Sequence, residues 1–157
     1  MTTPPTPEPR PIIPALAPLY DAVRDLGWPL IRFAAGIMLM PHGAQKLFGW
    51  FGGGGIDGFA AFFTKMGIEP AVPLVILSGA TELIGGFLLA IGFLTRPAAV
   101  AVVVLMLVAI VKVHLPAGYF GGSGGYEYAL LWGLVAVGIA LRGGGTLSVD
   151  RAIGREF

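Results

Sequence analysis

The side chains best suited to chemistry in this sequence are ionisable residues that interrupt, or lie close to, long apolar segments: His42, Lys46, Glu82, Lys112, His114 and Glu127. A lysine or histidine can donate a hydrogen bond to a carbonyl oxygen, and a nearby carboxylate can exchange a proton with the same ligand. Gln45, next to Lys46, adds an amide donor. These seven residues are the predicted ligand-binding residues. No catalytic residue is assigned, and no metal-ligand set is expected.

The composition of the chain predicts an integral membrane protein. Of its 157 residues, 55% are hydrophobic and only 12% are charged, about half the charged fraction of roughly 25% in soluble domains. Glycine occupies 25 positions, and small residues let helices pack closely in lipid. A net charge of +1 argues against nucleic acid as a partner. The absence of cysteine excludes thiolate catalysis, cysteine zinc sites and iron–sulfur clusters carried by this chain.

Four apolar segments predict an all-α, four-helix bundle in residues 28–142. We expect the membrane spans at about residues 28–47, 71–95, 97–115 and 126–141. Because a span needs about 20 residues, the last two reach across only if their outer ends include Lys112, His114 and Glu127. We expect residues 1–27 to form a disordered, proline-rich tail with a juxtamembrane segment, and residues 143–157 to form a cytoplasmic tail.

The outer connections of this bundle are predicted to be rich in glycine and aromatic residues. GWFGG at 49–53 is echoed by GYFGG at 118–122. The sequence between Phe59 and Met66 is too apolar for an ordinary exposed loop. We therefore expect a short interfacial or re-entrant helix there.

The ionisable residues are predicted to share one layer of the membrane. At 1.5 Å per residue, each lies about 20–27 Å from the cytoplasmic end of its helix, in a layer about 7 Å thick. Isolated charges at such depth are costly, so Glu82 is expected to pair with His42 or Lys46, and Glu127 with Lys112. Arg32 lies only about 6 Å deep, and is expected to form a separate inner pair or to reach the interface.

The distribution of basic residues predicts the orientation. In a four-span protein, one side holds Arg10, Arg24, Arg96, Arg142, Arg151 and Arg155, and the other holds Lys46, Lys65 and Lys112. Cytoplasmic loops carry the excess of basic residues. Both termini are therefore expected in the cytoplasm.

Four segments, taken together and in order, resemble the DoxX family of small four-helix membrane proteins. They are RFAAGIMLMPHGAQKLFG (32–49), TELIGGFLLAIGFLTRPAA (81–99), GGYEYALLWG (124–133) and GGGTLSVD (143–150). The resemblance implies a bacterial or archaeal cytoplasmic-membrane protein. Some members of the family are associated with respiratory or sulfur redox enzymes, including thiosulfate:quinone oxidoreductase, or with quinone or catechol stress.

The resemblance also implies a set of family-like positions. Four of them, His42, Lys46, Glu82 and Glu127, belong to the predicted polar layer. The others are expected to be structural: Arg32, Gly43, Gly85, Gly86, Arg96 and Asp150. Asp150 is expected to serve as a cap or turn at the cytoplasmic end of the last helix.

The favoured hypothesis is a redox-associated membrane subunit that binds a quinone-like molecule among the outer polar residues. Two alternatives stay open: a non-catalytic scaffold for a soluble oxidoreductase, and a small-molecule or ion transporter with Glu82 as a relay. A purely structural interpretation is that the charges only hold the bundle together. The sequence contains no self-sufficient catalytic motif, and a homo-oligomer fits each hypothesis.

Two further interpretations concern flat ligands. Aromatic residues near the outer loops can either wall such a ligand or form an interfacial belt, and the belt is favoured for Trp50, Phe51, Tyr119, Phe120, Tyr126 and Tyr128. Haem is disfavoured because His42 and His114, the only two histidines, differ by about 6 Å in predicted depth.

Overall fold

The computed structural model describes residues 11–157, and all regular structure in that range is helical. Three helical segments correspond to the predicted first, second and fourth spans. They are α2 (Gly27–Phe48), a continuous helix made of α4 (Ala71–Ala80), η3 (Thr81–Gly85) and α5 (Gly86–Ile91), and α7 (Glu127–Arg142). The third begins as α6 (Thr95–Ala109) and continues through η4 (Ile110–His114) and η5 (Leu115–Ala117).

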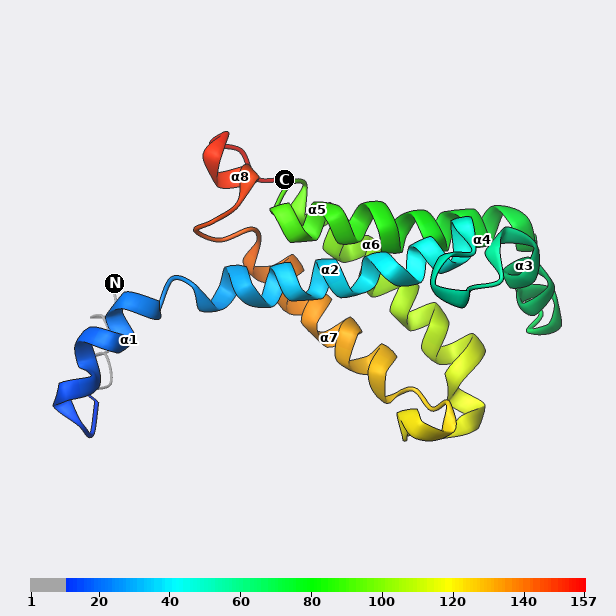
Figure 1. Ribbon diagram of the computed structural model, residues 1–157, viewed down its shortest axis with the longest axis horizontal. Helices are drawn as coiled ribbons and strands as arrows, with labels where there is room; N and C mark the ends of the chain where they lie inside the picture. The colour runs from blue at the N-terminus through cyan, green and yellow to red at the C-terminus, as the bar shows by residue number, and fades with distance from the viewer. Residues whose placement is uncertain (1–10) are drawn as a thin grey trace, which may run out of the picture.

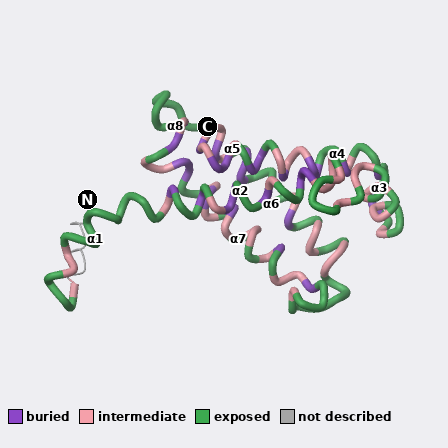
Figure 2. Tube along the Cα trace, in the orientation of Figure 1, coloured by how far each residue is buried: buried purple, intermediate pink, exposed green. Residues whose placement is uncertain are grey.

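The long helices pack mainly as two pairs. α2 packs along α4, η3 and α5, while α6 packs along α7, and α6 joins the pairs through contacts with α5 and η3. Figure 2 shows that buried residues gather where these helices meet. A buried cluster of apolar side chains joins α2, α5, α6 and α7 and includes Leu39, Leu89, Val102 and Ile139.

Glycines bring α2 against its partner helix. A Cβ placed on Gly43 would lie 2.5 Å from the carbonyl oxygen of Gly79, and one on Gly86 would lie 2.7 Å from that of Gly36. No side chain larger than hydrogen fits at such separations. Each helix thus carries two contact glycines seven residues apart.

The two apolar helices that follow α3 have the length and composition of membrane spans. Residues Ala71–Ile91 have a mean hydropathy of 2.0, and residues Thr95–Ala117 have a mean hydropathy of 2.6. The first ends four residues earlier than expected, because the chain turns through positive φ at Gly92 (70°) and Leu94 (48°). The next helix begins at Thr95, two residues before the expected Pro97.

Shorter helices occupy the two ends of the structure (Figure 1). α3 (Gly55–Lys65) lies at the end of α2 opposite the chain termini and covers most of the segment in which a short helix was expected. Two single turns, η2 (Trp50–Gly52) and η6 (Gly121–Ser123), lie in the glycine- and aromatic-rich connections.

The described part of the N-terminal segment is helical rather than extended. η1 (Pro14–Leu16) leads directly into α1 (Ala17–Val23), and neither contains a buried residue. α1 extends away from the long helices in Figure 1. Residues 1–10, where most of the proline-rich tail was expected, lie outside the described residues.

The C-terminal segment folds back onto the long helices instead of forming a free tail. The indole Nε1 of Trp28 donates to the carbonyl oxygen of Gly143 at 2.9 Å. α8 (Val149–Ala152) then places Asp150 against the turn between α5 and α6. Residues 143–156 therefore help to hold one end of the fold together.

Candidate ligand-binding site

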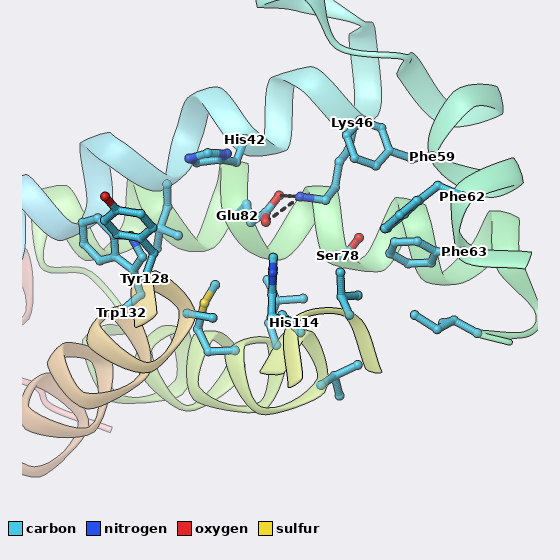
Figure 3. A pocket seen from close by; sticks show the side chains of 18 of the residues that line it. His42, Lys46, Phe59, Phe62, Phe63, Ser78, Glu82, His114, Tyr128 and Trp132 are labelled. Carbon is cyan, nitrogen blue, oxygen red and sulfur yellow. Dashed lines mark hydrogen bonds and ion pairs between the residues drawn. The ribbon is translucent and has the colours of Figure 1, made fainter. Parts of the chain in front are cut away.

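A cavity of about 600 Å³ lies between α2, α3 and α4 on one side and α6 and α7 on the other. Figure 3 shows side chains from both sides directed into it. Its polar lining consists of His42, Lys46, Ser78, Glu82, His114 and the hydroxyl-bearing Tyr128. The rest of the lining is aliphatic, aromatic or methionine side chains. A space of this size can enclose a ring-sized small molecule.

An ion pair crosses the polar side of the cavity. Lys46 Nζ lies 2.6 Å from each carboxylate oxygen of Glu82. The two side chains are only 15% and 8% exposed. The predicted pairing of Glu82 with Lys46 is confirmed, and the pair is held on the α2 and η3 sides of the cavity.

Local backbone geometry positions this pair. Gly43 and Gly79 allow α2 and α4 to approach closely, one turn away from Lys46 and Glu82. Glu82 lies in a π-helical turn, η3, inside an otherwise α-helical segment. Such turns insert a residue into the helical repeat and are frequent at functional sites. Close packing and a widened turn together bring the carboxylate to the lysine.

The two histidines lie on different walls of the same cavity. His42 belongs to α2, and His114 ends a second π-helical turn, η4. His114 Nδ1 lies 2.7 Å from the carbonyl oxygen of Gly124. Because a carbonyl only accepts, Nδ1 carries the proton, and Nε2 is left to interact with other groups. In Figure 3, Glu82 and His114 point into the cavity from opposite sides.

Aromatic side chains form much of the apolar lining. Phe59, Phe62 and Phe63 come from α3, and Tyr128 and Trp132 come from α7. Lys46 Nζ also lies 5.3 Å from the ring centroid of Phe59, a cation–π distance. The cavity therefore combines flat apolar surfaces with one charged corner.

Three predicted ligand-binding residues do not line this cavity. Gln45 Nε2 donates to the carbonyl oxygen of Phe51 at 3.4 Å, and the carboxylate of Glu127 accepts from the backbone N–H of Gly121 at 2.9 Å. Within residues 11–157, Lys112 is exposed and forms no salt bridge. The expected pairing of Glu127 with Lys112 is therefore wrong, because Glu127 caps its own loop.

The sequence matches the DoxX family model over residues 27–115. That match covers α2 through η4 and includes both residues of the ion pair. The chain belongs to the DoxX family. DoxX is a membrane family, in agreement with the two span-like helices.

Two proteins are similar to this DoxX chain. The first is a protein of Bacillus subtilis (strain 168) named "Putative oxidoreductase CatD", 32% identical over 126 residues, or 80% of this chain and 86% of that protein. The second is a Haemophilus influenzae protein named "Uncharacterized protein", 34% identical over 77 residues, or 49% of this chain and 51% of that protein. No solved structure shows significant similarity.

The charged members of the expected structural set, Arg32, Arg96 and Asp150, gather at the end opposite α3. Arg32 is 2% exposed and donates to four backbone carbonyls, those of Leu89, Ala90, Gly144 and Leu147. Within residues 11–157 it forms neither of the arrangements expected for it, a salt-bridged inner pair or a side chain reaching the interface. A guanidinium has five N–H donors in a planar fork, which suits it to joining several carbonyls at once.

Asp150 caps a different helix from the one expected. Its carboxylate accepts from the backbone N–H of Leu94 at 2.9 Å and of Thr95 at 3.0 Å, and from the Thr95 hydroxyl at 2.6 Å. It therefore caps the start of α6 rather than the end of α7. Arg96 serves the end of α7, donating to the carbonyl oxygens of Ala140 and Leu141.

Among the expected structural glycines, Gly85 is the exception. A Cβ at Gly85 would lie 4.0 Å from the nearest atom, Thr81 Cγ2, whereas Gly43 and Gly86 face backbone atoms. Gly36 and Gly79 were missed as their contact partners. Gly36 lies seven residues before Gly43, and Gly79 lies seven residues before Gly86; this spacing is a signal that could have identified both.

Sequence reasoning also missed most of the cavity wall. Of the aromatic residues considered as walls, only Tyr128 lines the cavity; Phe59, Phe62, Phe63 and Trp132 were not considered. The three phenylalanines recur at i, i+3 and i+4, which is the signature of one helical face. In residues 11–157, no group of three or more histidine, aspartate or glutamate side chains is arranged to hold a metal ion.

Proposed function

We propose that this DoxX-family membrane protein binds a quinone-like molecule in the cavity, as a redox-associated subunit. The observation that carries the proposal is the Lys46–Glu82 ion pair, which borders a largely apolar space of about 600 Å³. Charges in a membrane protein interior are costly and commonly serve function. A charged corner in an apolar cavity suits a ligand that is mostly hydrocarbon but has a carbonyl oxygen.

The lining matches the chemistry of a quinone ring. The Lys46 ammonium or a histidine can donate to a carbonyl oxygen, and the carboxylate of Glu82 can exchange a proton with it. Phe59, Phe62 and Trp132 supply flat faces for stacking. Reduction of a quinone to a quinol takes up two electrons and two protons, so the electrons would come from an associated redox protein. The oxidoreductase name of the Bacillus subtilis relative supports such a setting.

We further propose that the four long helical segments cross the bacterial or archaeal cytoplasmic membrane as a bundle. The described N-terminal helix and the C-terminal segment lie toward the same end in Figure 1, as an even number of spans requires. That end carries Arg96, Arg142 and Arg151, which favours its placement in the cytoplasm. The cavity then lies in the outer half of the membrane, with α3 at the outer surface.

The proposal is tested by extracting the purified protein and identifying the released small molecule by mass spectrometry. Wild-type protein is expected to release a quinone or a related ring carbonyl compound. Glu82→Gln and Lys46→Met are expected to release about tenfold less, which corresponds to a loss of about 1.4 kcal/mol in binding. Lys112→Met is the matched control, since Lys112 is an exposed lysine outside the cavity.

Titration of the purified proteins with an added quinone completes the test. If the wild type neither carries nor binds any quinone, the proposed function is wrong. If Glu82→Gln and Lys46→Met bind quinone as tightly as the Lys112→Met control, the ion pair is not its site.

A further inference from the structure

The cavity lies beside a separation between α2 and α7. At one end these helices are joined: Trp28 Nε1 donates to the Gly143 carbonyl oxygen at 2.9 Å, and the Arg142 guanidinium lies 4.8 Å from the Trp28 ring centroid. Figure 1 shows α7 diverging from α2 beyond this junction. Met38 and His42 of α2 and Tyr128 and Trp132 of α7 line the cavity where the helices have separated.

Exposure changes from the interior of the cavity to this separation. Glu82, Ser78 and Met106 are 5–7% exposed. Met38 and Tyr128 are 55% and 62% exposed, although both line the cavity. The lining therefore runs continuously from the buried ion pair to the outside of the protein between α2 and α7.

The surroundings of this opening are apolar. Met38 lies about 15 Å along α2 from Trp28, and Tyr128 lies about 21 Å along α7 from Arg142, both within the thickness of a hydrocarbon core. The neighbouring exposed side chains are Ile37 of α2 and Leu131 of α7. At this depth an exposed apolar surface faces lipid chains.

The outer end of the cavity is walled differently. Phe59, Phe62 and Phe63 of α3 line the cavity there, and all three are partly buried. A ligand approaching from the outer aqueous phase would meet these three rings. The side between α2 and α7 offers a path through lipid-facing side chains instead.

We infer that the cavity opens sideways into the bilayer between Met38 of α2 and Tyr128 of α7, and that its ligand carries a hydrocarbon tail. The carbonyl-bearing ring occupies the cavity beside Lys46 and Glu82, and the tail leaves between the two helices into lipid. This inference rests on the proposed function and narrows the ligand to a membrane-dissolved, tailed ring compound, as opposed to a water-soluble one.

The absence of native cysteine allows the opening to be closed chemically. In a Met38→Cys/Tyr128→Cys variant, a short bis-maleimide would bridge α2 and α7, and the mass increase identifies the bridged molecules. The probes are a decyl-substituted benzoquinone and the same ring without the tail. The quantity measured is the ratio of their affinities, which is insensitive to a general disturbance of the ring site.

Bridging is expected to lower the affinity ratio of tailed to untailed quinone by at least about tenfold, because a tail forced into a packed space is strongly disfavoured. Met38→Trp, which narrows the same opening without a reagent, is expected to shift the ratio in the same direction. A Val104→Cys/Leu134→Cys pair at exposed positions of α6 and α7 outside the cavity is the control, and its ratio should not change.

An unchanged affinity ratio in both the bridged variant and Met38→Trp would overturn the lateral opening while leaving the quinone site intact. If neither probe binds the wild type, the proposed function fails, and the opening loses its basis with it. The two failures are therefore distinguishable in one set of titrations.

Discussion

The two ends of the molecule use buried charged groups in opposite ways. At the end near the chain termini, which we propose is the inner one, Arg32 and Asp150 are surrounded by backbone groups of the chain itself, and each has several hydrogen-bond partners at fixed positions. At the opposite end, proposed to be the outer one, Lys46 and Glu82 contact each other but also border a cavity. The inner group, defined as Arg32, Thr95, Arg96 and Asp150, is called the inner lock here.

The difference separates a structural use of charge from the binding use that we propose for Lys46 and Glu82. In the inner lock, charged side chains satisfy helix ends. Arg32 and Arg96 donate to carbonyls at the ends of α5 and α7, and Asp150 accepts from the amides that begin α6. Little hydrogen-bonding capacity is left over. The outer pair keeps both charged groups at the edge of an open space, where a ligand can compete for them.

The largest loss of stability is expected from Arg32→Leu. The substitution removes the donor from four backbone carbonyls. The Leu147 carbonyl is only partly buried and the Leu89 carbonyl keeps the Gly92 N–H, so the buried carbonyls of Ala90 and Gly144 are left unsatisfied. Each unsatisfied buried group costs about 1–3 kcal/mol, so a loss of about 2–6 kcal/mol is expected. The free energy of unfolding in mixed micelles measures it. Arg151→Leu, at an exposed arginine, serves as the control and should change little. Equal losses of unfolding free energy in the two variants would show that Arg32 stabilises the fold no more than an exposed arginine does.

A smaller loss is expected from Gly43→Ala, at the contact that supports the outer pair. The added Cβ would lie 2.5 Å from the Gly79 carbonyl oxygen and would push α2 away from α4. Overpacking of this kind costs about 1–3 kcal/mol. Gly85→Ala has room for its Cβ, and is expected to be neutral or stabilising by up to about 1 kcal/mol, because alanine favours helix. The same sign for both substitutions would contradict the close-packing account.

Asp150→Ala is expected to destabilise the protein by about 1–2 kcal/mol, the usual value of a helix N-cap. It removes the acceptor for the Leu94 and Thr95 amides at the start of α6. Asp150→Asn keeps one acceptor oxygen and should recover part of the loss. Asp57→Ala on the exposed side of α3 is the matched control. Thermal unfolding of the four proteins ranks them, and an Asp150→Ala variant as stable as the Asp57→Ala control would exclude the capping role.

The smallest change in stability is expected from Glu82→Gln. The amide can still accept from Lys46, and the cavity leaves space for the side chains to adjust. A change within about 1 kcal/mol is expected, because Lys46 keeps an acceptor and its side chain, 15% exposed, borders the cavity rather than closed protein interior. Unfolding experiments like those for Arg32→Leu measure it. A loss as large as that of Arg32→Leu would make the outer pair structural, like the inner lock.

The long helices were predicted well from the sequence, because a helix is the only regular structure that suits each long apolar run. It also predicted that Glu82 would need a basic partner, since a carboxylate in an apolar helix must be paired. Lys46 was one of the two partners proposed. Helix ends were less accurate: the turn after Ile91 depends on positive φ at Gly92 and on Leu94, and on capping by Asp150 from far along the chain.

The cavity was only partly predictable, because its shape depends on contacts between distant segments. His42, Lys46, Glu82 and His114 were identified from type and depth. The phenylalanines of α3 were not, since the folding of that helix over the cavity is a tertiary effect. Depth along a helix also misplaced Glu127 and Lys112, because equal depth does not give a common direction, and π-helical turns at η3 and η4 rotate the faces on which residues lie.

Quinone quenching of tryptophan fluorescence tests the central claim most directly, because Trp132 lines the cavity while Trp28 and Trp50 do not. Titration of the wild type with a decyl-substituted benzoquinone is predicted to give saturable quenching that Trp132→Phe abolishes and that Glu82→Gln shifts to about tenfold higher concentration. Linear, unsaturable quenching that is the same in all three proteins would contradict the claim that the outer ion pair forms a quinone-binding site.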